Sequence, residues 1–185
     1  MKKTLFFYLL LIIACKDQPT NSATQNKNAG NCTVTVEEIQ SALIGKPLNT
    51  VANFNNCFEL RDTTIDDEEE VELKAKAYYQ NGNLAFLANS ADAINITRVT
   101  VETKNFSTKN GICVGDDMKK IMPFIGSEMP ILPDGYIGVL DKNNRKVMYQ
   151  LNSEDYPETL EQEIGNDVKK IPATMHVTAI VIDEK

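Results

Sequence analysis

Histidine is nearly absent from this sequence, and the cysteines follow no familiar metal-binding spacing. His176 is the only histidine among 185 residues, which excludes most general-base schemes built on imidazole. The cysteines include no Cys-x-x-Cys pair, so no zinc pattern is matched, and the common hydrolase, P-loop and zinc-protease motifs are absent. We therefore expect no metal, no cofactor and no enzymatic activity. A hydrolase that uses carboxylates alone, or a Cys113–His176 pair, would be the enzymatic alternatives.

Positive charge is also scarce. The chain carries 19 Lys and Arg against 26 Asp and Glu, a net charge of -7. Such a chain repels phosphate backbones, so we expect no nucleic-acid partner. The acidic run at 66–70 lacks the glycine and the alternating ligands of a calcium loop, so we expect a solvated loop there.

No hydrophobic run is long enough to span a membrane. The apolar segment 5–14 would rise about 15 Å as a helix, half of a ~30 Å hydrocarbon core. Because two lysines precede it, the segment is typical of a secretory signal peptide at 1–14. Its end, Ile12-Ile13-Ala14-Cys15, resembles the lipobox of bacterial lipoproteins, in which the cysteine after the cut receives diacylglycerol. The alternative is an ordinary signal peptide followed by an incidental cysteine.

The lipobox resemblance implies a protein held in the cell envelope, at the outer membrane, by lipid on Cys15. Two or three acyl chains would hold it firmly, since each buried methylene contributes ~0.8 kcal/mol. The polar composition of 15–31 predicts a flexible tether behind that lipid. Lys16-Asp17 resembles the charged signal that sends some Bacteroidetes lipoproteins to the cell surface, and Asp62-Thr63-Thr64 resembles their short O-glycan acceptor pattern.

Three cysteines remain for an oxidising compartment. We expect a disulfide between Cys32 and Cys57, because both lie in polar surroundings in the first half. Closing that loop would contribute around 3 kcal/mol on the chain-entropy model. Cys113 lies between Ile112 and Val114 and is expected to be a buried small hydrophobe.

Hydrophobic periodicity predicts a helix and three strands in the first half. Thr35 and Glu38 form a capping-box pattern for a helix over 35–45. The residues 63–70 are expected to form a polar loop. Alternating apolar positions then predict strands, and Asn81-Gly82 is a hairpin turn signal. These strands are expected at 71–79, 84–87 and 94–102.

The second half repeats this order, with a helix followed by strands. The expected elements are a helix over 116–122, a hairpin of 136–140 and 146–151, a short helix over 158–164 and a final strand over 177–183. Residues 96–102 match 177–183 at an offset of 81, and 37–39 match 116–118 at an offset of 79. The two offsets predict tandem units at 32–105 and 106–185, and chance likeness of amphipathic segments is the alternative. The expected fold class is α+β, with antiparallel sheets and helices packed on one face.

One segment carries a family resemblance. Thr108-Lys109-Asn110-Gly111-Ile112-Cys113-Val114-Gly115-Asp116-Asp117, ending near Phe124-Ile125-Gly126, resembles the entry to a helix in small envelope lipoproteins of the SmpA/OmlA-like or β-lactamase-inhibitor-like kind. The resemblance implies helices on an antiparallel sheet and a protein-binding or structural role, and it carries over no catalytic residue. Pro123 departs from the pattern and is expected to shorten or bend the helix.

These observations favour a lipid-anchored envelope protein that binds another protein or supports envelope structure without catalysis. The alternative is a surface-displayed inhibitor of a hydrolase, which would present Ile131 and Leu132 from the proline-flanked loop 129–135. A buried connection is the simpler interpretation of that loop. Exposed apolar surface distinguishes the classes: a broad patch favours assembly, a protruding loop favours inhibition and a deep cleft favours an enzyme.

Overall fold

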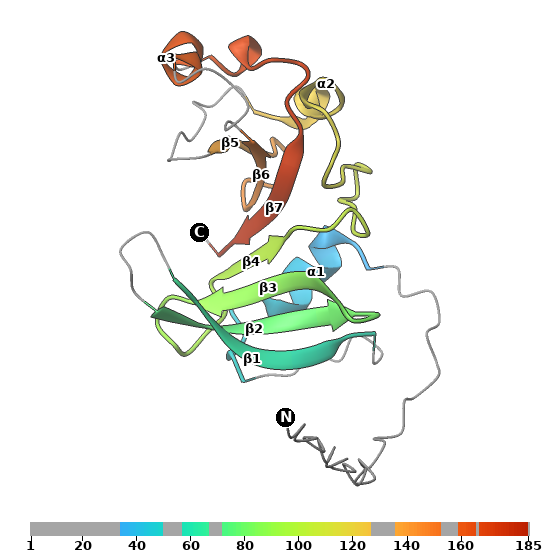
Figure 1. Ribbon diagram of the computed structural model, residues 1–185, viewed down its shortest axis with the longest axis vertical. Coiled ribbons are helices and arrows are strands. Elements are labelled where there is room, and N and C mark those ends of the chain that lie inside the picture. The colour runs from blue at the N-terminus through green and yellow to red at the C-terminus, as the bar shows by residue number, and fades with distance from the viewer. Residues whose placement is uncertain are drawn as a thin grey trace, which may run out of the picture.

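Alternating apolar residues along the strands build one antiparallel sheet in the computed structural model (Figure 1), which describes residues 34–49, 57–66, 72–126, 136–152, 159–165 and 167–184. The seven strands follow the order β1-β2-β3-β4-β7-β6-β5. They are β1 (Glu59–Asp66), β2 (Glu72–Gln80), β3 (Asn83–Ser90), β4 (Arg98–Val101), β5 (Tyr136–Leu140), β6 (Val147–Asn152) and β7 (Val177–Asp183). A sheet with a few short helices confirms the coarse α+β prediction.

The first strand was not predicted. Residues 63–66 belong to β1, so the expected polar loop over 63–70 is wrong for its first four residues, and 67–70 lie outside the described residues. β1 pairs with β2 from Glu59↔Tyr79 to Asp66↔Glu72 without a register shift. The β-branched residues Thr63, Thr64 and Ile65 favour extended backbone once a neighbouring strand supplies partners. A polar edge strand thus carries no strong sequence signal of its own.

The predicted hairpin between β2 and β3 is confirmed. Asn81 and Gly82 have φ angles of 52° and 81°, the left-handed pair that a tight two-residue turn requires. The predicted strand at 94–102 is shorter, since β4 begins only at Arg98. β4 pairs with β7 at the centre of the sheet, where Arg98 and Asp183 also form a side-chain ion pair.

The longest described helix is α1 (Val36–Leu43), with eight residues, and the other four helical segments have three to five residues each. The helix α1 has the predicted capping box, in which Glu38 N–H donates to Thr35 and Thr35 N–H donates to the Glu38 carboxylate. The helix α2 (Met118–Ile121) gives way to a 3-10 turn, η1 (Met122–Phe124), which contains Pro123 as the sequence predicted. The others are α3 (Leu160–Ile164) and η2 (Val168–Lys170). No helix in the described ranges is both long and apolar enough to cross a membrane.

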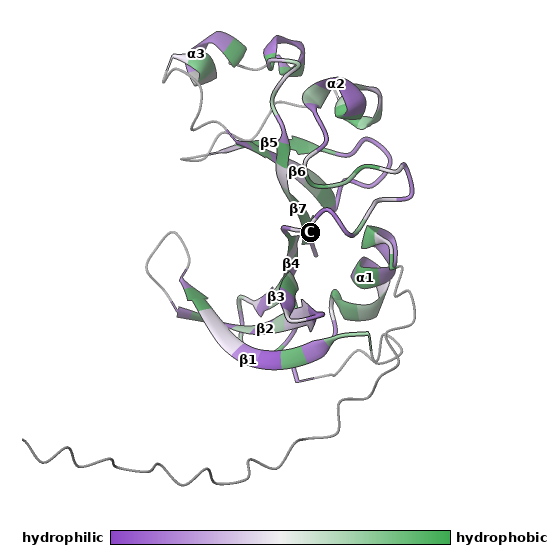
Figure 2. Cartoon of the chain, turned by 45° about the vertical axis from the view of Figure 1, so that its right-hand side comes forward, coloured by the Kyte–Doolittle hydropathy of each residue, from purple (hydrophilic) through white to green (hydrophobic). Residues whose placement is uncertain are grey.

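The hydrophobic core lies between α1 and one face of the sheet. Val36, Ile39 and Leu43 of α1 are buried in the same cluster as Tyr78 and Phe86, whose rings stack at 4.3 Å between centroids. Figure 1 shows α1 behind β3, and Figure 2 shows the sheet curving from β5 at one end to β1 at the other. Strand residues on the other face, such as Ala77, lie on the side of the sheet away from α1.

Candidate functional site

A groove lies on the first half of the sheet. It encloses about 870 Å³ between β1, β2 and two loops, 47–49 and 93–94. Strand alternation places Asp62 and Thr64 on the same face as Leu60, and Lys74 and Lys76 on the same face as Tyr78. Because Leu60 and Tyr78 pack in the core beside α1, the groove lies on the helix-bearing face of the sheet.

Backbone hydrogen bonds join the two loops into one wall. Gly45, which follows the C-cap residue Ile44 of α1, has a φ of 73° and its N–H donates to Ile96 O at 2.9 Å. Leu48 N–H then donates to Ile94 O at 2.8 Å, and Ile96 N–H donates to Lys46 O at 2.8 Å. This short ladder turns an aliphatic edge made by Pro47, Leu48 and Ile94 towards the strands.

Ile94 is an exposed aliphatic side chain on that wall, with 64% of its surface accessible. Its backbone is fixed by Asp92, whose Oδ1 accepts from Ile94 N–H at 2.8 Å and from Asn95 N–H at 2.9 Å. These backbone hydrogen bonds, that of Asn95 first, lower the pKa of Asp92. A large aliphatic side chain held out by a fixed turn is a usual mark of a contact surface.

The strand side of the groove is polar. The Lys76 ammonium pairs with the Asp62 carboxylate across the two strands. Only 18% of the Lys76 side chain is exposed, against 85% of Asp62, so the lysine lies along the sheet and reaches outward to its partner. Lys74 lies two residues before Lys76 on the same face of β2. It is exposed and forms no ion pair within the described part of the chain. Among the described residues that line the groove, Lys74 is therefore the positive charge without an ion-pair partner, in a protein of net charge -7.

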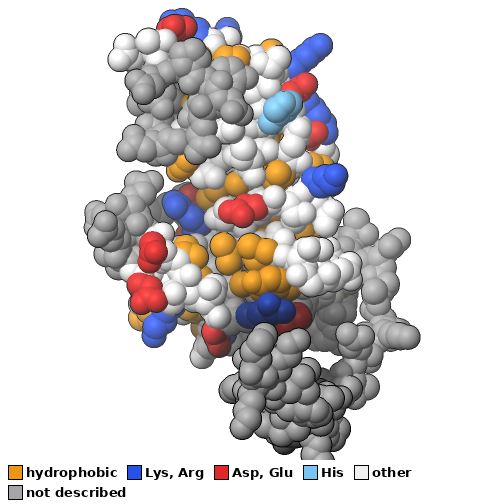
Figure 3. All heavy atoms as spheres, viewed as in Figure 1, with side chains coloured by type: hydrophobic (Ala, Val, Ile, Leu, Met, Phe, Trp, Pro, Cys, Tyr) orange, Lys and Arg blue, Asp and Glu red, His pale blue; other side chains and the backbone are white. Residues whose placement is uncertain are grey.

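A second surface is the face of the sheet that carries no helix in the described residues. Its middle row runs through Ala77, Leu87, Thr100, Val181 and Met148. Figure 3 shows hydrophobic side chains gathered over the lower strands in the view of Figure 1, with charged side chains around them.

Charged contacts flank this second surface. The Arg61 guanidinium lies 4.1 Å from the centre of the Tyr79 ring. On the other side, Arg98 donates to both carboxylate oxygens of Asp183, at 2.7 and 3.3 Å, beside a hollow of about 460 Å³. Of the middle row, Leu87 and Thr100 are half-buried, whereas Ala77, Val181 and Met148 are buried. Arg61 and Arg98 are each paired with a carboxylate, of Glu59 and Asp183 respectively.

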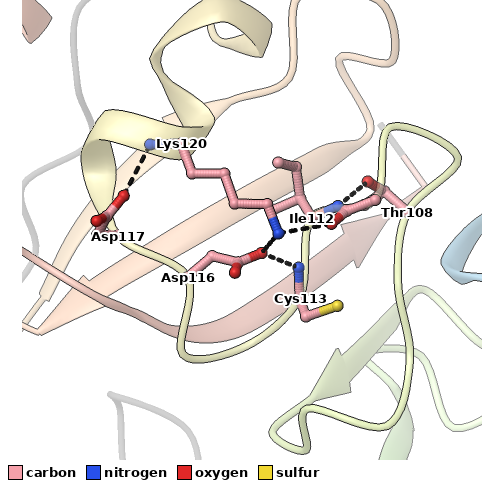
Figure 4. Close-up of polar contacts among 7 residues, drawn as sticks. Thr108, Ile112, Cys113, Asp116, Asp117 and Lys120 are labelled. Atoms are coloured by element: carbon pink, nitrogen blue, oxygen red, sulfur yellow. Dashed lines mark hydrogen bonds and ion pairs between the residues drawn. The ribbon is translucent and has the colours of Figure 1, made fainter.

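The segment that resembles envelope lipoproteins forms a tightly bonded loop (Figure 4). Lys120 Nζ donates to Asp116 Oδ2 at 2.6 Å and to Gly111 O at 2.9 Å, while Asp116 Oδ2 accepts from Cys113 N–H at 2.7 Å. Asp117 caps α2 by accepting from Lys120 N–H at 2.8 Å. These bonds give the loop a structural role at the entry to α2.

The thiol in that loop is poorly suited to nucleophilic chemistry. Cys113 is free and only partly buried, so the expectation of a buried small hydrophobe is wrong in degree. Burial, followed by the nearby Asp116 carboxylate, raises the pKa of the Cys113 thiol, whereas a nucleophile needs a lowered one. His176 is exposed and its backbone bridges to Asp117.

A buried polar cluster joins α1 to the second half. Tyr149 Oη donates to Asp141 Oδ2 at 2.7 Å, and both residues are buried. Asp141 Oδ1 accepts from the backbone N–H groups of Asn143 at 2.8 Å and Asn144 at 3.0 Å, and the Asn144 side chain donates to Gln40 of α1 at 2.8 Å. The cluster fixes the β5–β6 turn against α1, and none of its residues lines the groove beside β1 and β2 or the hollow beside Arg98.

Four of the residues singled out from the sequence lie outside the described residues. These are Cys15, Cys32, Ile131 and Leu132. Cys57 is disulfide-bonded, and its partner also lies outside the described residues, so the Cys32–Cys57 pairing stays a prediction. No group of three or more His, Cys, Asp or Glu that could hold a metal occurs in the ranges that the structure describes.

Sequence reasoning missed the groove altogether. Ile94 was assigned to the start of a strand, although Asp92 two positions earlier is a typical turn-forming residue. That turn is the local signal that could have shown Ile94 to be on a loop. The approach of the 47–49 loop depends on tertiary pairing that no local pattern carries.

Comparisons with known proteins bear on the fold alone. No family model matches the chain, and no curated protein matches it. Among solved structures, the chain is similar to the crystal structure of the uncharacterized protein yfeY from Escherichia coli, with a TM-score of 0.54 and 17% identity. That likeness covers 77% of this chain and 97% of the other.

Proposed function

We propose that this protein is a lipid-anchored, non-enzymatic component of the cell envelope that binds a partner protein through the groove beside β1 and β2. The anchor is the lipid on Cys15 that the lipobox resemblance implies, and the location is the outer membrane. The observation that carries the proposal is the exposed Ile94 held out over a groove with a polar strand side.

The chemistry of the groove supports binding over catalysis. Its titratable side chains are Asp62, Lys74 and Lys76, and two of the three are already joined in an ion pair. A general acid–base mechanism needs paired groups poised over a substrate, whereas a contact surface needs aliphatic area with a polar rim. Pro47, Leu48 and Ile94 supply the aliphatic area, and the charged strand residues supply the rim.

We further propose that the fold arose from two related units, 32–105 and 106–185, joined edge to edge. The sequence offset of 81 relates Thr100 to Val181, and these two residues are register partners. The same offset relates Val99 to Ile180 and Val101 to Ile182, so it converts the register pair Val99↔Ile182 into the pair Val101↔Ile180. Two strands related in this way have a two-fold axis that passes through the Thr100↔Val181 pair. This register supports the tandem arrangement.

The helices support the same arrangement at a slightly different offset. Thr35 caps α1 and Asp117 caps α2, which lies 82 positions later instead of the 79 suggested by the sequence match. With this offset the buried residues of α1 correspond to buried residues in the second half. The pairs are Val36 with Met118, Ile39 with Ile121, and Leu43 with Ile125.

The test is cross-linking of the lipidated full chain in intact envelopes. An Ile94→Asp variant puts a charge on the groove wall, and we expect it to lose the cross-linked partner. Leu84→Asp is the matched control, since Leu84 is also an exposed large hydrophobic residue, at 36%, but lies on β3 outside the groove. Equal capture by all three forms, or equal loss in both variants, would contradict the proposed site.

A further inference from the structure

The groove runs along a strand at the edge of the sheet. β1 pairs with β2 through eight consecutive residue pairs, and no described strand pairs with its other side. Asp62, Thr63 and Thr64 of this strand also line the groove. An edge strand presents a row of backbone donors and acceptors to which an extended segment can add.

The charged residues of β1 and β2 form a regular series of cross-strand pairs along this edge. On the groove-bearing face, cross-strand partners follow one another in the order Asp62/Lys76, Thr64/Lys74 and Asp66/Glu72. The first pair is neutralised by its own ion pair. The second has a positive charge without an ion-pair partner in the described ranges, and the third places two exposed carboxylates opposite each other, which is unfavourable by itself.

We propose that the groove takes an extended segment of the partner protein, added as a strand along β1, with the pattern aliphatic-x-acidic-x-basic on its groove-facing side. The aliphatic side chain packs beside the neutral Asp62–Lys76 pair against the wall that includes Ile94. The acidic side chain lies beside Thr64 and reaches across it to Lys74, and the basic one lies beside Asp66 and reaches towards Glu72. This inference rests on the proposed function and adds the chemistry of the partner.

A peptide fits this surface better than a small anion does. Successive groove-facing residues of a strand lie about 6.6 to 6.8 Å apart, which is the spacing between the paired positions on β1. A small anion would use Lys74 alone and leave both the aliphatic wall and the carboxylate pair without contacts. The unsatisfied features therefore point together to a strand with alternating charge.

The probe is a synthetic peptide, acetyl-Thr-Thr-Val-Thr-Glu-Thr-Lys-Thr-amide, with a twin in which Glu and Lys are exchanged. Binding to the full lipidated chain in detergent is measured by isothermal titration calorimetry, which needs no label on the peptide. We expect the first peptide to bind about tenfold more tightly than the twin, because two favourable charge pairs become two unfavourable ones. In Lys74→Glu this preference is lost or reversed, and in Lys104→Glu, an exposed lysine outside the groove, it is kept.

Main-chain pairing is tested separately. N-methylation of alternate peptide amides removes the donors that a strand addition needs, so binding is lost, and hydrogen exchange at alternate β1 amides slows only with the unmodified peptide. Equal binding of the methylated peptide, equal binding of the twin, or no binding of either peptide overturns the inference. Partner capture that depends on Ile94 and is unchanged in Lys74→Glu leaves the proposed function standing and removes this inference alone.

Discussion

Removing one hydroxyl from the core tests whether the buried polar cluster stabilises the fold. Tyr149→Phe keeps the ring and deletes the donor that lies 2.7 Å from Asp141 Oδ2. A hydrogen bond to a charged group contributes about 1.5 to 3 kcal/mol net, and the carboxylate is too buried for water to replace the lost donor easily. We therefore expect a loss of about 2 kcal/mol in the free energy of unfolding.

The assay is urea unfolding followed by circular dichroism, with the disulfide of Cys57 intact. With a slope of about 2 kcal/mol per molar urea, the midpoint should fall by about 1 M. Tyr136→Phe is the matched control, because Tyr136 is a half-buried tyrosine of β5 with no side-chain hydrogen bond in the described structure, and its midpoint should stay within about 0.2 M. If both variants unfold at the native midpoint, the hydroxyl bond makes no net contribution and the reasoning is refuted.

Three further predictions use the same structure. Thr35→Ala removes the hydroxyl that accepts from Glu38 N–H and leaves the backbone N–H that donates to the Glu38 carboxylate, so it should cost about 1 kcal/mol in urea unfolding, whereas a Thr35→Ser variant should stay near the native value. Burial raises the pKa of Tyr78 to about 12, so the folded state favours the neutral phenol. The free energy that this group adds to stability is therefore complete below pH 10 and falls as the pH rises towards 12. In alkaline unfolding curves, Tyr78→Phe should lose less stability over that pH range than the native protein does. The raised pKa of the Cys113 thiol predicts slower alkylation by iodoacetamide at pH 8 than that of a free cysteine in urea-unfolded protein, and equal rates would contradict the structure around it.

Local signals predicted the parts of the fold whose causes are local. The capping box of Thr35 and Glu38 and the Asn81-Gly82 turn each satisfy backbone requirements within four residues, so a short window of sequence contains the whole cause. The position of Pro123 likewise marked where α2 gives way to a 3-10 turn. These features were confirmed with their boundaries shifted by a few residues.

The missed features depend on partners far along the chain. β1 has a polar sequence and becomes a strand because β2 pairs with all eight of its residues. The strand predicted to start at Ile94 starts instead at Arg98, because the backbone before it pairs with the loop after α1. The groove combines both effects, so its shape could not be derived from periodicity, although its residues were visible in the sequence.

The position of β7 between β4 and β6 has a consequence for how the chain folds during its synthesis. β7 follows every other described strand along the chain, yet it pairs with β4 on one side and β6 on the other. Before β7 has been synthesised, β1–β4 and β5–β6 can form only two separate groups of paired strands, and β4 and β6 each have an unpaired side. Joining the two groups requires contacts between distant residues, such as that of Arg98 with Asp183, 85 residues apart. Long-range pairing of this kind is slow to form and leaves strand edges exposed to other chains meanwhile. The arrival of one late strand thus sets the length of the period in which the nascent protein is vulnerable to aggregation.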